Sequence, residues 1–299
     1  MGLSATRQGE SFILSSALFW GLFPVITILS YDRLSPLVSL AWSTLFSALF
    51  FAVVLTFKKS WSEIKNKTAR RDILWMTLFI GILYYVFFFF GLKYTSAGNA
   101  SIIALTEVLA SFIFFHVWRK DYIPKEHIIG AALMLVGAAV VLFPNVSHWR
   151  AGDWLILAAV AVAPFGNFFQ QRARCQVSSE VIMFIRALIA TPVIFLLAWL
   201  FGANPAAIDL RGSLYFLLIN GCLLLGLTKL FWIEGIHRIS VTKANALASL
   251  SPLMTLLFAW LLLHNFPTVW QLLALVPMFF GVLLLARNGQ ASNPPVFRD

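Results

Sequence analysis

The chain is divided almost from end to end into apolar runs long enough to cross a lipid bilayer. A spanning helix needs about 20 predominantly apolar residues. Runs of that kind cover residues 12–31, 36–57, 73–93, 97–118, 124–143, 152–171, 179–201, 212–234, 240–264 and 267–286. They do not alternate with the two-residue period of barrel strands. The pattern therefore predicts an all-α integral membrane protein with ten transmembrane helices.

The composition of the chain supports a membrane protein over a soluble one. Sixty per cent of the residues are hydrophobic and 11% are charged. So few charges cannot cover the surface of a soluble domain, so we expect the lipid bilayer to surround most of the protein. The first run follows Arg7 without a convincing cleavage site, so it is expected to be a helix and not a removed signal peptide.

The positive charges predict how the helices are oriented. With the N-terminus in the cytoplasm, most Lys and Arg residues lie in loops on the cytoplasmic side, as the positive-inside rule requires. The densest group lies in "KKSWSEIKNKTARRD", residues 58–72, which we expect to be a solvated loop. The net charge of +10 is explained by these loops, so no nucleic-acid partner is expected.

Two halves of the chain resemble each other. Small and aromatic residues recur at one constant offset, in the pairs Phe87 with Phe231, Gly91 with Gly235, Ser96 with Ser240, and Gly137 with Gly281. This predicts two five-helix repeats, residues 1–144 and 145–299. Because each repeat has an odd number of spans, the second is inverted relative to the first. Inverted repeats are typical of secondary transporters, with the substrate near the middle of the membrane.

Prolines occupy matching positions in the first and sixth runs. A proline inside a helix frees a backbone carbonyl, and interrupted helices often border transporter binding sites. We therefore predict helix breaks at Pro24 and Pro164. Asn167 follows the second proline and is a candidate substrate-binding residue.

Three charged residues lie inside the apolar runs and well away from their ends, where a charge costs roughly 2.5–3.5 kcal/mol at the centre of a helix. Glu107 and Lys229 are candidates to bind an amino group and a carboxylate of a substrate. The alternative is that they pair with each other or with Arg186 and only stabilise the bundle. For Arg186 we favour a structural role, with its side chain extending toward the membrane surface.

The aromatic residues of the third run, "YYVFFFFGLKY", also separate into two groups. Tyr84 and Tyr85 carry hydroxyls near the middle of the span, which favours their lining a cavity. Phe88 shares a helix face with Tyr84, whereas most of residues 87–90 are expected to face lipid. Further candidate substrate contacts away from the predicted interfaces are Trp20 and Trp42.

Small polar residues cluster where the fourth and ninth runs begin. Asn99 and Ser251 are candidate substrate contacts in these two runs, and Asn245 is a related position. Close helix packing is the alternative role for such residues.

The repeated segments resemble a known family. The segments "GLKYTSAGNASIIALTEVLASF" (91–112) and "GIHRISVTKANALASLSPLMTLLFAWLLL" (235–263) resemble helix junctions of the drug/metabolite transporter superfamily, EamA-type branch. Arg186 in "VIMFIRALIA" resembles an arginine of that family, whereas Ser43 stands at the matching place of the first half. The family often has Glu-Pro where this chain has Glu107-Val108. "FWGLFPV" in the first run is most similar to bacterial aromatic amino acid exporters.

This resemblance implies an exporter in the cell inner membrane, with small amphipathic metabolites such as aromatic amino acids as substrates. An exporter of organic cations or drugs is the alternative, since tyrosines and Trp20 could bind a cation. An intramembrane enzyme is a less favoured alternative, because no HExxH motif or paired mid-span carboxylates occur. A receptor or scaffold is also less favoured, because an inverted repeat has no obvious purpose there. Cys175 and Cys222 are expected to be free thiols, and no cofactor or metal is expected. The sequence leaves the oligomeric state open.

Overall fold

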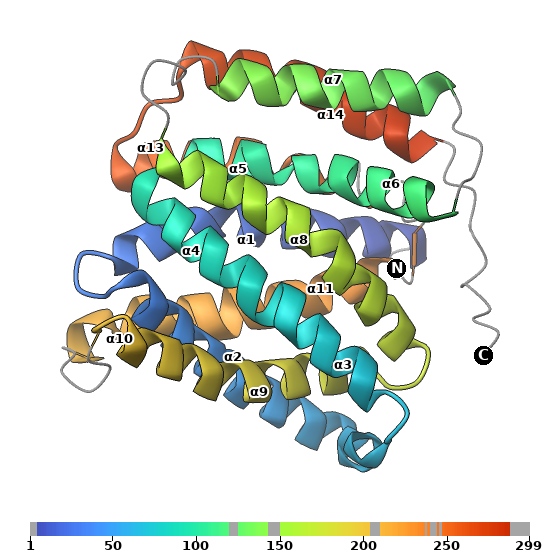
Figure 1. The fold of residues 1–299 in the computed structure, drawn as a ribbon, viewed down its shortest axis with the longest axis vertical. Helices are drawn as coiled ribbons and strands as arrows, with labels where there is room; N and C mark the ends of the chain where they lie inside the picture. Colours follow the sequence, from blue (N-terminus) through green and yellow to red (C-terminus); the bar gives the residue numbers. More distant parts are fainter. Residues whose placement is uncertain are drawn as a thin grey trace.

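The structure of the chain is a computed structural model, which describes residues 5–119, 125–142, 150–203, 210–236, 238–239, 244 and 247–287. The regular elements within these ranges are all helices (Figure 1). Eight helices are long and apolar enough to cross a membrane, and two shorter apolar helices cover Ser251–Leu263 and Val269–Leu285. The ninth predicted run is thus confirmed as a helix only from residue 251 onward, because much of 240–246, including Asn245, lies outside the described residues.

The first half of the chain forms five helical runs. Its α-helices are α1 (Ala5–Ser30), α2 (Pro36–Lys58), α3 (Arg70–Met76), α4 (Tyr84–Tyr94), α5 (Ala97–Ala104), α6 (Thr106–Arg119) and α7 (Lys125–Leu142). A short 3₁₀-helix, η1 (Ser60–Lys65), follows α2, and a π-helical segment, η2 (Thr77–Leu83), joins α3 to α4.

The second half follows the same plan. Its helices are α8 (Ala151–Arg174), α9 (Ser179–Leu200), α10 (Leu210–Leu218), α11 (Thr228–Ile236), α13 (Ser251–Leu263) and α14 (Val269–Arg287). The π-helical segment η4 (Ile219–Leu227) joins α10 to α11 at the place where η2 lies in the first half. A continuous α-helix was expected in both runs. Each π segment changes the helix phase near mid-span, a feature often found at functional sites.

The helices of the two halves pack against one another in matching pairs. Helix α4 of the first half packs on α8 of the second, and α11 of the second packs on α1 of the first. The equivalent helices α2 and α9 pack together, as do α7 and α14. Figure 1 shows the α7–α14 pair along one edge of the bundle and the α2–α9 pair toward the opposite edge. Each half therefore depends on the other for its buried surface.

The expected helix breaks at Pro24 and Pro164 are corrected by the structure. Helix α1 continues through Pro24, and α8 continues through Pro164. A proline removes one backbone donor, but the residues on either side can keep their helical hydrogen bonds. The fourth run is instead interrupted at Leu105, between α5 and α6, where the backbone forms a turn.

The third run is more deeply buried than its aromatic composition suggested. Phe88 and Phe89 are 2% and 0% exposed, which corrects the prediction that most of residues 87–90 face lipid. Phe23 of α1 lies against both rings, with centroids 5.6 Å and 5.8 Å away. The reason is that α4 packs between helices of both halves, so only part of its circumference is free to contact lipid.

Polar contacts connect the two halves at the end of the bundle that carries Lys58 and Arg172. Lys58 Nζ lies 3.3 Å from Glu180 Oε1, and Arg172 Nε lies 3.2 Å from Asp72 Oδ2. The backbone N–H of Ser178 donates to Glu63 Oε2 at 2.6 Å. The segment that we expected to be a solvated loop is therefore held partly against the second half.

Glycines set the close approach of α7 and α14. A Cβ atom built on Gly130 would lie 2.9 Å from the carbonyl oxygen of Gly281, and one on Gly281 would lie 2.8 Å from that of Gly130. The neighbouring atoms are backbone, so a larger side chain must push the helices apart. Small residues commonly permit such packing between membrane helices.

Replacing Gly130 with leucine should therefore destabilise the protein, by about 1–3 kcal/mol as in other overpacked sites. The measurement is the apparent melting temperature of the purified protein in detergent. Ala132→Leu is the matched control, because Ala132 is exposed on the same helix and its enlargement meets no partner helix. Equal melting temperatures for the two variants would contradict the glycine contact.

Candidate functional site

A carboxylate inside the bundle is held by a residue of the other half. Glu107 lies in the first turn of α6, where the helix dipole favours a negative charge. The side chain of Asn167 in α8 donates a hydrogen bond from Nδ2 to Glu107 Oε1 at 3.0 Å. The two residues are half-buried. The structure thus brings together two of the predicted site residues from opposite halves of the chain.

A cation inside the bundle lies on the face of a tryptophan. Lys229 lies in the first turn of α11 (Thr228–Ile236), and its Nζ atom is 3.9 Å from the centroid of the Trp20 ring in α1. Lys229 also interacts electrostatically with Glu107 and Arg186. Within the described residues, neither cation forms an ion pair of 4 Å or less with Glu107. The direct pairing that was the alternative to substrate binding is therefore not found among the described residues.

A third charge lies deeper than the sequence indicated. Arg186 is only 6% exposed, so its side chain does not extend to the membrane surface as we expected. Its guanidinium carbon is 5.8 Å from the centroid of the Tyr85 ring. Gly81 makes room for it, since a Cβ atom there would lie 3.0 Å from Arg186 Cγ. Arg186 lies roughly two turns inside α9, and this distance from the end of the helix could have indicated that its side chain is buried.

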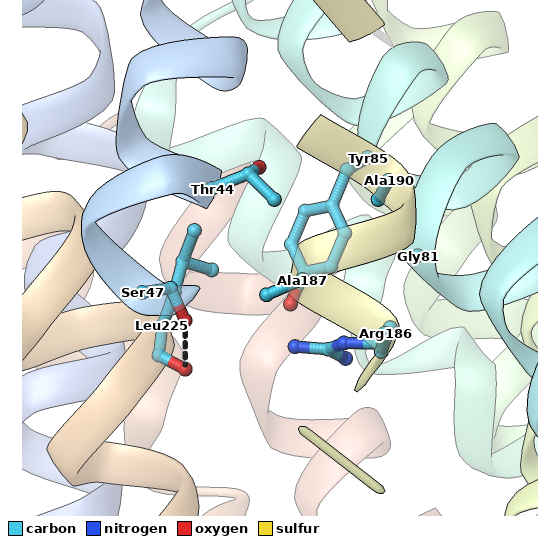
Figure 2. A pocket seen from close by; sticks show the side chains of 8 residues that line it. All are labelled: Thr44, Ser47, Gly81, Tyr85, Arg186, Ala187, Ala190 and Leu225. Carbon is cyan, nitrogen blue, oxygen red and sulfur yellow. Dashed lines mark hydrogen bonds between the residues drawn. The ribbon is translucent and has the colours of Figure 1, made fainter. Parts of the chain in front are cut away.

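Arg186 borders a small pocket between the two halves. The cavity has a volume of about 10 Å³ and is partly open, and it is lined by Thr44, Ser47, Gly81, Tyr85, Arg186, Ala187, Ala190 and Leu225. Figure 2 shows the Arg186 guanidinium and the Tyr85 hydroxyl at the same side of this space, opposite Ser47. Ser47 donates to the carbonyl of Leu225 at 3.4 Å. Four helical runs contribute: α2, the η2–α4 run, α9 and η4.

Aromatic rings connect this pocket to Trp20. Tyr84 and Tyr85 are 7% and 5% exposed, and their ring centroids lie 5.2 Å apart. Tyr84 stacks on Phe88 at 5.7 Å, and Phe23 stacks on Trp20 at 4.7 Å. The rings of α1 and α4 thus form one continuous aromatic cluster beside the charges.

Asn99 and Trp42 lie away from these charges, whereas Ser251 lies close to Trp20. Asn99 accepts a hydrogen bond from Gln271 of α14 at 2.7 Å, so it anchors the start of α5. Trp42 packs edge-on against Phe195 at 5.4 Å, and its indole N–H has no hydrogen-bond partner in the described structure. The carbonyl of Ser251 lies beside Gly21, one residue from Trp20, where a Cβ would approach it to 3.0 Å.

The described part of the chain contains no candidate metal-binding cluster. Across the described ranges, no three His, Cys, Asp or Glu side chains gather in a way that could hold a metal ion. Cys175 and Cys222 are free thiols, as predicted.

Paired halves that meet around a few buried charges, in an all-helical membrane protein, are typical of transporters with internal repeats. The chain belongs to the EamA-like transporter family, which matches it twice, over residues 7–143 and 150–287. These two matches correspond to the two halves seen in the structure. The family assignment confirms the superfamily resemblance seen in the sequence, and it supports a transporter over an enzyme.

Similar proteins are also transporters by name. The uncharacterized transporter YoaV of Bacillus subtilis is 21% identical over 279 residues, covering 91% of this chain and 94% of that protein. The uncharacterized transporter YyaM of the same organism is 23% identical over 286 residues, with 91% of each chain covered. A solved crystal structure matches with a TM-score of 0.68 at 19% identity, covering 95% of this chain and 98% of the other. That likeness shows the fold alone.

Proposed function

We propose that the protein exports small amphipathic metabolites, with aromatic amino acids as the favoured substrates, across the cell inner membrane. The repeats, residues 1–144 and 145–299, are inverted relative to one another, and both termini lie in the cytoplasm. Transport follows alternating access, in which the two halves rock around a central site. The export direction comes from the family resemblance of the first helix, and the orientation comes from the distribution of positive charge.

The observation that carries this proposal is the meeting of opposite charges and aromatic rings between the two halves. Glu107 and Trp20 belong to the first half, whereas Asn167 and Lys229 belong to the second. Charged residues inside a membrane bundle are costly and usually mark a substrate or ion pathway. A site built from both halves changes shape when the halves move, as alternating access requires.

The chemistry of the side chains matches an amphipathic zwitterion. Glu107 can accept hydrogen bonds from a substrate ammonium group, and Lys229 can donate to a carboxylate. Both have weak partners at present, an amide for Glu107 and a ring face for Lys229, which a substrate could replace. Tyr84 and Phe88 offer stacked ring surface to an aromatic side chain.

Flux of labelled phenylalanine from liposomes tests this proposal. We expect the wild-type protein to move it faster than empty liposomes do. Tyr84→Ala should slow the flux about tenfold, because a lost aromatic contact costs about 0.5–1.5 kcal/mol beyond the lost buried area. Tyr94→Ala is the matched control, since Tyr94 is 50% exposed on the same helix. Tyr84→Phe keeps the ring and separates a packing defect from the loss of the hydroxyl.

The absence of phenylalanine flux in correctly folded protein would rule out this substrate. Equal slowing by Tyr84→Ala and Tyr94→Ala would instead rule out the site at the third run. Either result leaves the transporter family assignment in place.

The organic-cation alternative rests on the same tryptophan. The face of Trp20 already accommodates the ammonium group of Lys229, which shows that the ring can bind a cation. However, Lys229 and Arg186 are both positive and would repel a cationic substrate. Inhibition of flux by a quaternary amine, with no inhibition by phenylalanine, would favour this alternative.

A further inference from the structure

Arg186 is a buried cation whose hydrogen-bonding capacity is largely unused. A guanidinium has five N–H donors in a planar fork, and it is not deprotonated in proteins. Within the described residues, no carboxylate lies within 4 Å of it, and its close side-chain neighbour is the ring of Tyr85. Buried charges in proteins are normally paired, and this one has no anionic partner among the described residues.

The guanidinium borders open space. Of the eight residues that line the pocket, Arg186 is the one with a charged side chain. Figure 2 shows its planar group and the hydroxyl of Tyr85 at the edge of that space, so both can donate to a molecule placed there. Gly81 widens the pocket on the same side, where a side chain would contact Arg186. A planar acceptor with two oxygens fits the fork of an arginine in two parallel hydrogen bonds.

The charges inside the bundle do not balance. Among the described residues deep in the spans, Lys229 and Arg186 are positive and Glu107 is negative. Lys229 interacts electrostatically with both of the others, so the three charges form one group. Glu107 Oε1 already accepts a hydrogen bond from Asn167. The group of three charges therefore has surplus positive charge in a low-dielectric region, and a bound anion would reduce this cost.

We propose that the pocket beside Arg186 is a carboxylate subsite, and that the transported solutes are amphipathic carboxylic acids for which the amino group is optional. This inference rests on the proposed function and narrows its substrate class. Arg186, in place of Lys229, binds the carboxylate in a bidentate manner, Tyr85 donates a further hydrogen bond, and the aromatic cluster of α1 and α4 holds the apolar part. A solute that lacks the carboxylate leaves the Arg186 fork without a partner and binds weakly.

Three ligands with the same ring distinguish the two polar groups. Phenylalanine has both groups, 3-phenylpropionate has only the carboxylate, and 2-phenylethylamine has only the amino group. The measurement is the rise in apparent melting temperature of purified protein at increasing ligand concentration. We expect the first two to stabilise the wild-type protein at similar concentrations. 2-Phenylethylamine should need at least about ten times more, because loss of a charge-assisted hydrogen bond weakens binding about ten- to a hundredfold.

Two variants test the assignment to this residue. Arg186→Gln should abolish stabilisation by both carboxylates, and Arg186→Lys should restore it in part, since lysine keeps the charge but not the fork. Arg71→Gln is the control, because Arg71 is exposed and should leave every ligand effect unchanged. Equal stabilisation by 2-phenylethylamine and phenylalanine, or an unchanged response of Arg186→Gln, would overturn the proposal.

The melting measurements also distinguish an error in the proposed function from an error in the carboxylate subsite. If none of the three aromatic ligands stabilises the wild-type protein, the aromatic part of the proposed function is wrong. The same measurement with acetate, succinate and benzoate, against sodium chloride at equal ionic strength, then decides the subsite. Stabilisation of wild type but not of Arg186→Gln supports the carboxylate subsite with another apolar part. No difference between the two proteins overturns it.

Discussion

Glu107→Gln should destabilise the protein more than Lys229→Met, although either change should stop transport. Removal of the Glu107 charge leaves Lys229 and Arg186, which repel each other, without a compensating anion. Removal of the Lys229 charge leaves Glu107 with Arg186, so the remaining charges balance. Uncompensated charge within a membrane bundle carries a free-energy cost, so we expect Glu107→Gln to lose on the order of 2 kcal/mol more stability.

The measurement is the apparent melting temperature of the two single variants and of the double variant. The double variant should lie between them, because it removes both a favourable and an unfavourable interaction. Transport of phenylalanine should fall at least about tenfold in all three, since each changes the balance of the three charges that lie between the two halves. The opposite order of stability would show that the three charges do not act as one group.

Glutamine at position 107 also tests a role in proton transfer. It keeps an acceptor for the amide of Asn167 but cannot take up a proton. If the Glu107→Gln variant transports normally at every pH, a proton-carrying role for this residue is excluded.

Gly81→Leu should close the pocket beside Arg186 and stop transport while the protein remains folded. The position of a Cβ at Gly81 is 3.0 Å from Arg186 Cγ and 3.2 Å from Thr77 Cγ2. The neighbouring atoms are side chains, so they can shift more readily than backbone can. The leucine would then extend into the space that the pocket leaves between the two halves.

We expect phenylalanine flux to fall at least about tenfold in Gly81→Leu. The free energy of unfolding should fall by about 1–3 kcal/mol, as at other overpacked sites, and this lowers the melting temperature. Gly81→Ala should show a smaller effect of the same sign on flux. Leu78→Phe is the control, because Leu78 is 38% exposed on the same π segment and points away from the packed interior. Normal flux through Gly81→Leu would show that the pocket is not on the transport route.

Much of the membrane architecture could be predicted because the bilayer imposes simple rules on a sequence. Backbone polar groups must be paired inside hydrocarbon, so long apolar runs must form helices. The repeat could be recognised because helices that pack in equivalent places need small residues at equivalent positions. Gly130 and Gly137, with Gly281 of the second half, show this in the α7–α14 contact.

Local helix geometry was harder to predict. A proline at position 24 or 164 suggests an interruption, yet both helices continue, while the π segments and the turn at Leu105 contain no proline. Such changes of helix type depend on how neighbouring helices pack. These contacts join residues that are far apart in the sequence, so the pattern along one helix does not predict them.

The sequence by itself determined the solvent of this protein, the positions of most helices, the duplication, and the presence of charges that lipid cannot accommodate. Only the tertiary structure decided which partners those charges have: Asn167 for Glu107, the ring of Trp20 for Lys229, and a pocket for Arg186. The physical reason is that burial in lipid depends on residue type along one helix. The partner of a buried charge depends on which faces of several helices meet.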